Sequence, residues 1–124
     1  MVNVLFVGMG GFAGAVIRYL ISIIPIKTEF PFHTLCTNIA GALIIGIVVG
    51  LIDADALPKS RHQLFWKTGF CGGLTTFSTF SFESLSLIEK GKYVQGGIYI
   101  VLSIFFCIVG VMVGRMIVMK ARGI

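Results

Sequence analysis

Long apolar stretches dominate this chain of 124 residues and restrict what it can fold into. Hydrophobic residues make up 56% of the sequence, charged residues only 12%, and the mean hydropathy is +0.99. Soluble domains carry about twice that share of charged residues. A helix needs about 20 apolar residues to cross a bilayer, so we predict an all-α membrane protein. It forms one domain, residues 1–124, with four transmembrane helices at Val2–Ile24, Thr34–Ile52, Leu64–Ile88 and Val94–Met119.

The basic residues lie near the ends of these predicted helices, singly or in pairs, and not along one exposed face. That distribution argues against a nucleic-acid partner despite the net charge of +5. Four spans place both termini on one side of the membrane. That side and the second loop, with Lys59 and Arg61, hold six basic residues, and the opposite side holds four. Because the positive-inside preference is therefore weak, we expect insertion in both orientations and an antiparallel homodimer.

The third predicted span is unusually polar. Gly72 and Gly73 weaken the helix, and five hydroxyls follow within seven residues: Thr75, Thr76, Ser78, Thr79 and Ser81. Broken helices at membrane depth usually line a path or a site. We therefore expect a break near Gly72–Thr75, where freed backbone carbonyls would coordinate a cation such as sodium. The alternative is a simple kink in which threonine hydroxyls satisfy the backbone.

Two phenylalanines follow the glycines. Phe77 and Phe80 are three residues apart and so share one side of a helix. An aromatic ring is positive at its edge and negative on its face, which allows a ring edge to approach a dehydrated anion. The hydroxyls of Thr79 and Ser81 would run beside these rings. The alternative interpretation is that both phenylalanines pack against neighbouring helices.

Polar side chains also interrupt the second and fourth predicted spans. Asn38 carries an amide whose NH₂ group is a suitable anion donor. Tyr99 and Ser103 are four residues apart and share a helix face with Cys107. Each of these groups can instead form a hydrogen bond between helices and nothing more.

Charged residues inside the spans give a competing function. Arg18 and Lys67 lie toward helix ends, where they either reach the membrane surface or attract anions to a vestibule. Glu83 is the one carboxylate well inside an apolar stretch. A single buried carboxylate is typical of the coupling group of a small proton-coupled multidrug antiporter. No set of residues indicates an enzyme.

Three motifs together resemble the small bacterial fluoride channels of the CrcB/Fluc type. The first is Gly10-Gly-Phe-Ala-Gly-Ala-Val-Ile-Arg18-Tyr19, the second is Thr34-Leu-Cys-Thr-Asn38-Ile-Ala-Gly41, and the third is Gly69–Glu83. They occur in order, at the right spacing, and the resemblance covers essentially the entire chain. Two positions depart from the family pattern: Thr37 replaces a more usual aliphatic residue, and Cys107 replaces a second hydroxyl one turn after Ser103.

The resemblance implies an antiparallel, dual-topology homodimer with two fluoride pathways and a structural sodium ion at its centre. The backbone carbonyls of Gly72 and Thr75 would bind the sodium ion, and Arg18 would lie at a wide vestibule. The fluoride pathway would be lined by Asn38, Phe77, Phe80, Thr79, Ser81, Tyr99, Ser103 and Glu83.

The implied function is passive export of fluoride across the bacterial cytoplasmic (inner) membrane, which protects the cell against fluoride toxicity. The chain would be a multi-pass membrane protein whose partners are fluoride, sodium, lipid and a second copy of itself. A structural subunit of a larger membrane complex, held by glycine-rich helix faces, is a further alternative.

Overall fold

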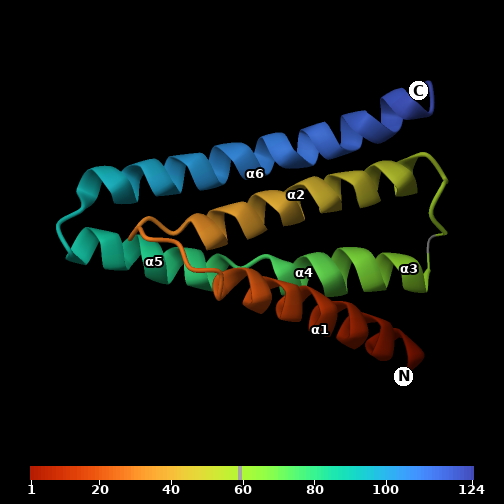
Figure 1. Ribbon diagram of the computed structural model, residues 1–124. Coiled ribbons are helices and arrows are strands. Elements are labelled where there is room, and N and C mark those ends of the chain that lie inside the picture. Colours follow the sequence, from red (N-terminus) through yellow and green to blue (C-terminus); the bar gives the residue numbers. More distant parts are fainter. Residues whose placement is uncertain (59) are drawn as a thin grey trace.

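The computed structural model describes residues 1–58 and 60–124, and every regular element within them is helical. Lys59, counted above in the second loop, lies outside the described residues. The elements in chain order are α1 (Val2–Ser22), α2 (Phe32–Asp53), α3 (Arg61–Gln63), the π-helix η1 (Leu64–Cys71), α4 (Gly72–Leu74), α5 (Phe77–Glu89) and α6 (Tyr93–Ala121) (Figure 1).

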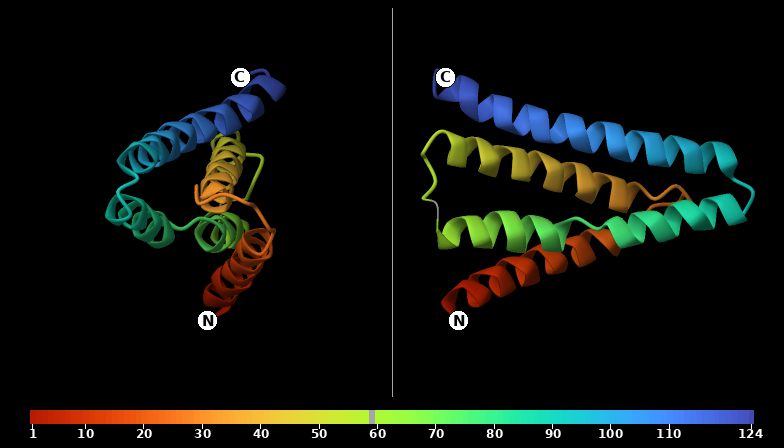
Figure 2. Two further views of the ribbon diagram at one scale, coloured as in Figure 1. Left: turned by 60° about the vertical axis from the view of Figure 1, so that its left-hand side comes forward. Right: turned by 180° about the vertical axis from the view of Figure 1, so that it is seen from behind.

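The elements form an elongated bundle. α2 runs beside α6, whereas α1 packs along η1 and α4, and α5 packs against α6 (Figures 1 and 2). Both termini lie at the same end of the bundle, together with the connection between α2 and α3 (Figure 2). The turn between α5 and α6 lies at the opposite end (Figure 1). This arrangement agrees with an even number of crossings.

Within residues 1–58 and 60–124, three helices are long and apolar enough to cross a membrane: α1, α2 and α6. The third predicted span is instead divided, because α3, η1 and α4 run without interruption to Leu74 and α5 begins only at Phe77. Thr75 and Thr76 between them have extended backbones. The glycines that we expected to weaken this helix, Gly72 and Gly73, are themselves helical, so the non-helical residues follow the glycine pair.

Glycines bring the helix backbones close together in two places. A Cβ atom at Gly14 would lie 2.7 Å from the backbone nitrogen of Leu74, so α1 tolerates no side chain there. A Cβ atom at Gly114 of α6 would likewise lie 2.8 Å from the backbone nitrogen of Ile47 in α2. Four glycine pairs spaced by four residues make these contacts: Gly10 and Gly14, Gly69 and Gly73, Gly46 and Gly50, and Gly110 and Gly114. Small residues at this spacing let helices approach closely where lipid removes the hydrophobic drive for association.

Ion pairs lie toward both ends of the bundle. Arg115 of α6 lies 2.8 Å from Asp53 at the end of α2, and Lys92 pairs with Glu29 between the two connections at the other end. The sides of the bundle are apolar, and large hydrophobic side chains are exposed along α1 and α6. Charged ends and apolar sides are the distribution that a bilayer requires.

Candidate functional site

The break in the third segment is held by Asn38 of α2. The Thr76 backbone N–H donates to Asn38 Oδ1 at 2.8 Å, and Asn38 Nδ2 donates to the Thr76 carbonyl at 3.2 Å. One amide side chain thus satisfies both backbone groups of an extended residue. One N–H of the Asn38 amide is left over from this pairing, so the side chain both supports the break and retains a donor.

The start of α5 is capped by a threonine. The Thr76 hydroxyl accepts a hydrogen bond from the Thr79 backbone N–H at 3.2 Å and donates to the Thr79 hydroxyl at 3.1 Å. Threonine before the first helical residue is a preferred cap because the first N–H groups of a helix have no partner within it. Asn38 and the cap together explain why α5 begins where it does.

The carbonyls that end α4 have different partners. Cys71 accepts from the Thr75 N–H at 3.0 Å and from the Thr75 hydroxyl at 2.7 Å. Gly73 accepts from Arg18 Nε of α1 at 3.0 Å. Among the described residues, no donor reaches the carbonyls of Gly72 or Thr75. These two oxygens are therefore available to a ligand. Arg18, which we expected at a vestibule or at the membrane surface, donates this bond to the broken helix.

Glu83 joins three helices through two hydroxyl groups. Thr34 of α2 donates to Glu83 Oε1 at 2.8 Å, and Tyr99 of α6 donates to Glu83 Oε2 at 2.7 Å. Tyr99 is fully buried, and its ring packs against Phe80 with ring centroids 5.3 Å apart. Both carboxylate oxygens act as acceptors, so Glu83 works here as a structural link between α2, α5 and α6.

The two phenylalanines differ in environment. Phe80 is buried beside Tyr99, whereas the Phe77 side chain is 80% exposed. Their ring centroids are 5.5 Å apart with planes inclined by 44°. Phe80 therefore belongs to the core of the chain, while Phe77 presents its ring outside it.

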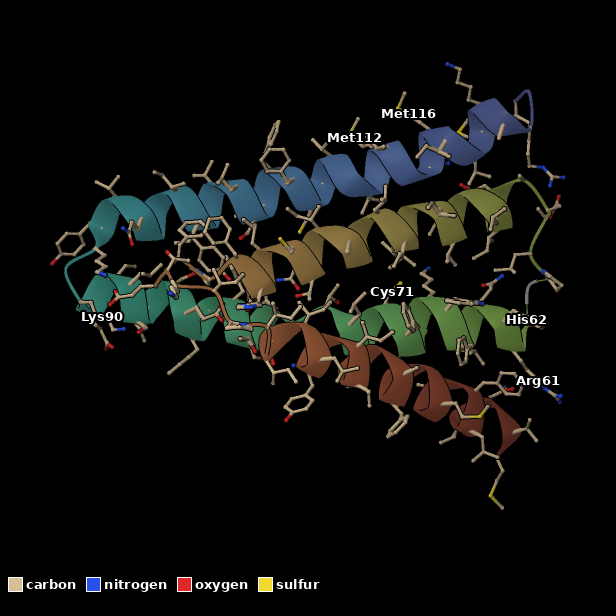
Figure 3. The ribbon with its side chains drawn as sticks, viewed as in Figure 1. Arg61, His62, Cys71, Lys90, Met112 and Met116 are labelled. Atoms are coloured by element: carbon tan, nitrogen blue, oxygen red, sulfur yellow. The ribbon has the colours of Figure 1, made fainter. Side chains whose placement is uncertain are left out.

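A groove of about 470 Å³ runs beside the break, between α2, η1 and α6. Ser103 lies on its wall with a buried hydroxyl that has no hydrogen-bond partner among the described residues. Cys71, which Figure 3 labels at the mid-length of the bundle, lines the same groove. The rest of the lining is largely apolar. Six of the site residues expected from the sequence line this groove: Asn38, Gly72, Thr75, Phe77, Phe80 and Ser103. Lys67 and Cys107 line it as well.

The remaining expected site residues lie away from the groove lining. Ser81 donates its hydroxyl to the Phe77 carbonyl at 2.9 Å within α5. Thr79, Glu83 and Tyr99 are engaged in the bonds described above, and Arg18 contacts the back of the break. The structure thus separates the expected set into a groove-lining group and a supporting group.

Two supporting residues were not singled out by the sequence: Thr34, which holds Glu83, and Thr76, which caps α5. Thr34 is one turn before Asn38 on α2, and that spacing was the available signal. Thr76 was one hydroxyl among five, and only the fold identifies it as the cap. Thr37, the departure next to Asn38, is buried and donates back to the carbonyls of His33 and Thr34 on its own helix.

Comparison with known proteins gives consistent similarities over nearly the whole chain. The family described as "CrcB-like protein, Camphor Resistance (CrcB)" matches residues 5–115. A "Fluoride-specific ion channel FluC" from Methanococcus maripaludis is 44% identical over 94% of this chain and 95% of its own. Proteins of the same name from Ruminiclostridium cellulolyticum and Pseudoalteromonas translucida are 46% and 39% identical over 94% and 92% of this chain, and over 92% and 98% of their own.

Proposed function

The chain belongs to the CrcB-like protein family, and we propose that it forms a fluoride-specific ion channel in the cytoplasmic membrane. The observation that carries this proposal is the match to relatives bearing that name along more than nine-tenths of both chains. The activity is transport, and fluoride would leave the cell passively, down its own gradient.

The groove offers the kind of contacts that a small, strongly hydrated anion needs. A pore must replace the water around such an ion with donors in a narrow space. The free N–H of Asn38 and the unpartnered hydroxyl of Ser103 both lie on the groove wall. Phe77 and Phe80 border the same space, and we propose that their ring edges contact fluoride.

The supporting hydroxyls and Glu83 form the second part of the proposed pathway. Thr79 and Ser81 lie on α5 on either side of Phe80, and Tyr99 of α6 is bonded to Glu83. The hydroxyls of these residues are already hydrogen-bonded within the protein. Fluoride passing here would therefore replace protein atoms as the hydrogen-bond partner of each hydroxyl. Several weak sites in succession suit conduction, because a single deep site would retain the ion.

A proton-coupled antiporter is not favoured. Its coupling group would have to take up and release a proton, but each oxygen of Glu83 accepts a hydrogen bond from a neighbouring hydroxyl. The names of the relatives also point to a channel and not to an antiporter.

We further propose that a second copy completes the pathway in an antiparallel homodimer. One chain provides only one wall: Phe77 is largely exposed at the groove, and Gly72 beside it is exposed as well. Exposed backbone carbonyls at membrane depth must be buried in protein or line a water-filled cavity, and a second copy would provide either. Dual insertion, expected from the weak charge bias, would supply that partner in the opposite orientation.

The carbonyls of Gly72 and Thr75 fit a structural sodium ion. They are hard oxygen donors without partners among the described residues, and both residues line the groove. When bound, sodium would supply positive potential beside the anion path. The chain's own contribution is to keep α4 short and Thr75 extended, so that both oxygens remain free.

Reconstitution in liposomes tests the function. Purified protein should release trapped fluoride, followed with a fluoride electrode, while chloride leaves at least about tenfold more slowly. Protein-free liposomes provide the baseline. Equal release of chloride and fluoride, or no release of fluoride, would refute the proposed channel.

A further inference from the structure

Arg18 occupies a defined place on the packed face of α1. Gly14 and Gly10 are four and eight residues before it, so the three residues lie on one side of the helix. That side faces η1 and α4, and the two glycines allow the backbones to touch. Arg18 continues this face one turn after Gly14, and it reaches α4 where α4 ends.

The contact uses one particular nitrogen. Arg18 Nε donates to the Gly73 carbonyl at 3.0 Å, and the side chain is partly buried. This carbonyl lacks the N–H four residues later that a continuous helix would supply, because Thr75 and Thr76 are extended. The guanidinium thus replaces a missing backbone donor at the end of α4.

The position of one residue around the axis of α4 fixes the positions of its neighbours. Successive residues of an α-helix are turned by about 100° around the axis, since 3.6 residues complete a turn. Gly73 lies on the α1 side, where an added Cβ atom would meet the backbone of Gly11, whereas a Cβ atom at Gly72 would meet nothing within 4 Å, so Gly72 lies on a different side of α4. Gly72 and Thr75 line the groove on the other side of α4, whereas Gly73 does not.

We propose that Arg18 is a positioning residue whose Nε–H holds the end of α4, so that the Gly72 and Thr75 carbonyls face the groove where a cation can bind. This inference rests on the proposed function, because it assigns the support of the proposed sodium site. The working part of the side chain is the donor at Nε, and its positive charge is not required for this role.

Three substitutions separate the donor from the charge. In Arg18→Gln the amide nitrogen follows Cδ, as Nε does in arginine, so a donor is kept while the charge is lost. Arg18→Met keeps similar length without donor or charge. Arg18→Lys keeps the charge but moves the donor one atom further. Arg122→Gln, at the far end of α6, is the control for loss of one positive charge.

Sodium-dependent thermal stability of the purified protein in micelles is the readout, followed by fluorescence of the single tryptophan, Trp66 in η1. Sodium chloride is titrated against N-methylglucamine chloride at constant ionic strength. Loss of a residue that orients metal ligands typically lowers affinity by 10- to 100-fold. We expect the sodium midpoint to rise about tenfold or more in Arg18→Met, and less than about threefold in Arg18→Gln and Arg122→Gln.

The result that overturns the proposal is the opposite order, with Arg18→Lys like the unmodified protein and Arg18→Gln as impaired as Arg18→Met. Unchanged midpoints in all three variants also overturn it. If Arg18→Met fails to fold, the contrast between Gln and Lys decides in the same way. An unmodified protein without sodium-dependent stability refutes the sodium site itself and this inference with it, whereas absence of fluoride efflux refutes the channel.

Discussion

Replacing Asn38 by alanine should weaken both the fold and the proposed transport. The substitution removes two hydrogen bonds, of 2.8 and 3.2 Å, and leaves the N–H and carbonyl of Thr76 without protein partners. A neutral hydrogen bond contributes about 1 kcal/mol net, and hydrogen bonds between membrane helices average slightly less. We therefore expect a loss of about 2 kcal/mol in the free energy of unfolding, or about thirtyfold in the folding equilibrium.

Transport should fall more than stability alone requires, because Asn38 also offers a donor to the groove. The free energy of unfolding is measured by denaturant titration in mixed micelles with Trp66 fluorescence, and fluoride efflux is measured in liposomes. Cys36→Ala is the matched control, since Cys36 is exposed on the same helix. A loss under about 0.5 kcal/mol together with efflux equal to that of Cys36→Ala would refute the role assigned to Asn38.

Further predictions concern the rings, the carboxylate and the helix contacts. Phe77→Ile should slow fluoride efflux at least about tenfold with little loss of stability, whereas Phe80→Ile should lower both efflux and stability, because only Phe80 is buried. Unchanged efflux in both variants would exclude the rings from the mechanism. Glu83→Gln should destabilise the chain by about 1 kcal/mol, since one hydroxyl loses its acceptor. Proton uptake coupled to efflux in the unmodified protein would contradict the assignment of Glu83 as a structural link. Gly14→Ala should lower the free energy of unfolding by about 1–3 kcal/mol through overpacking. Gly8→Ala, where a Cβ meets nothing within 4 Å, should leave it almost unchanged. Equal losses in the two variants would show that α1 and α4 can move apart freely.

Composition and apolar run length were enough to predict the helical membrane architecture. Each of the four stretches is long enough to cross a bilayer, and with only 12% charged residues the chain leaves no segment for a soluble domain. The glycines also indicated close helix contacts. Which glycines face each other could not be predicted, because the pairing depends on the order in which the helices surround one another.

The site was predicted in its residue types but not in its contacts. Gly72 and Gly73 indicated a weak point, yet the extended residues are Thr75 and Thr76, because Asn38 from another helix binds both backbone groups of Thr76. The partner of Arg18 was likewise hidden, since a residue 55 positions away supplies it. Such long-range bonds leave no periodic signal in a single sequence. The sodium ion and the antiparallel dimer stay predictions.

The glycine contacts also determine the order in which the chain can assemble as it is made. α1 finds its close partner only when η1 and α4 have been synthesised, and α2 finds its own only when α6 has followed. The pairing is therefore interleaved, first segment with third and second with fourth. In a chain that stops at Gly91, α1 would already be packed against η1 and α4. The glycine face of α2 would still lack its partner α6, so a helix of another membrane protein could pack against it.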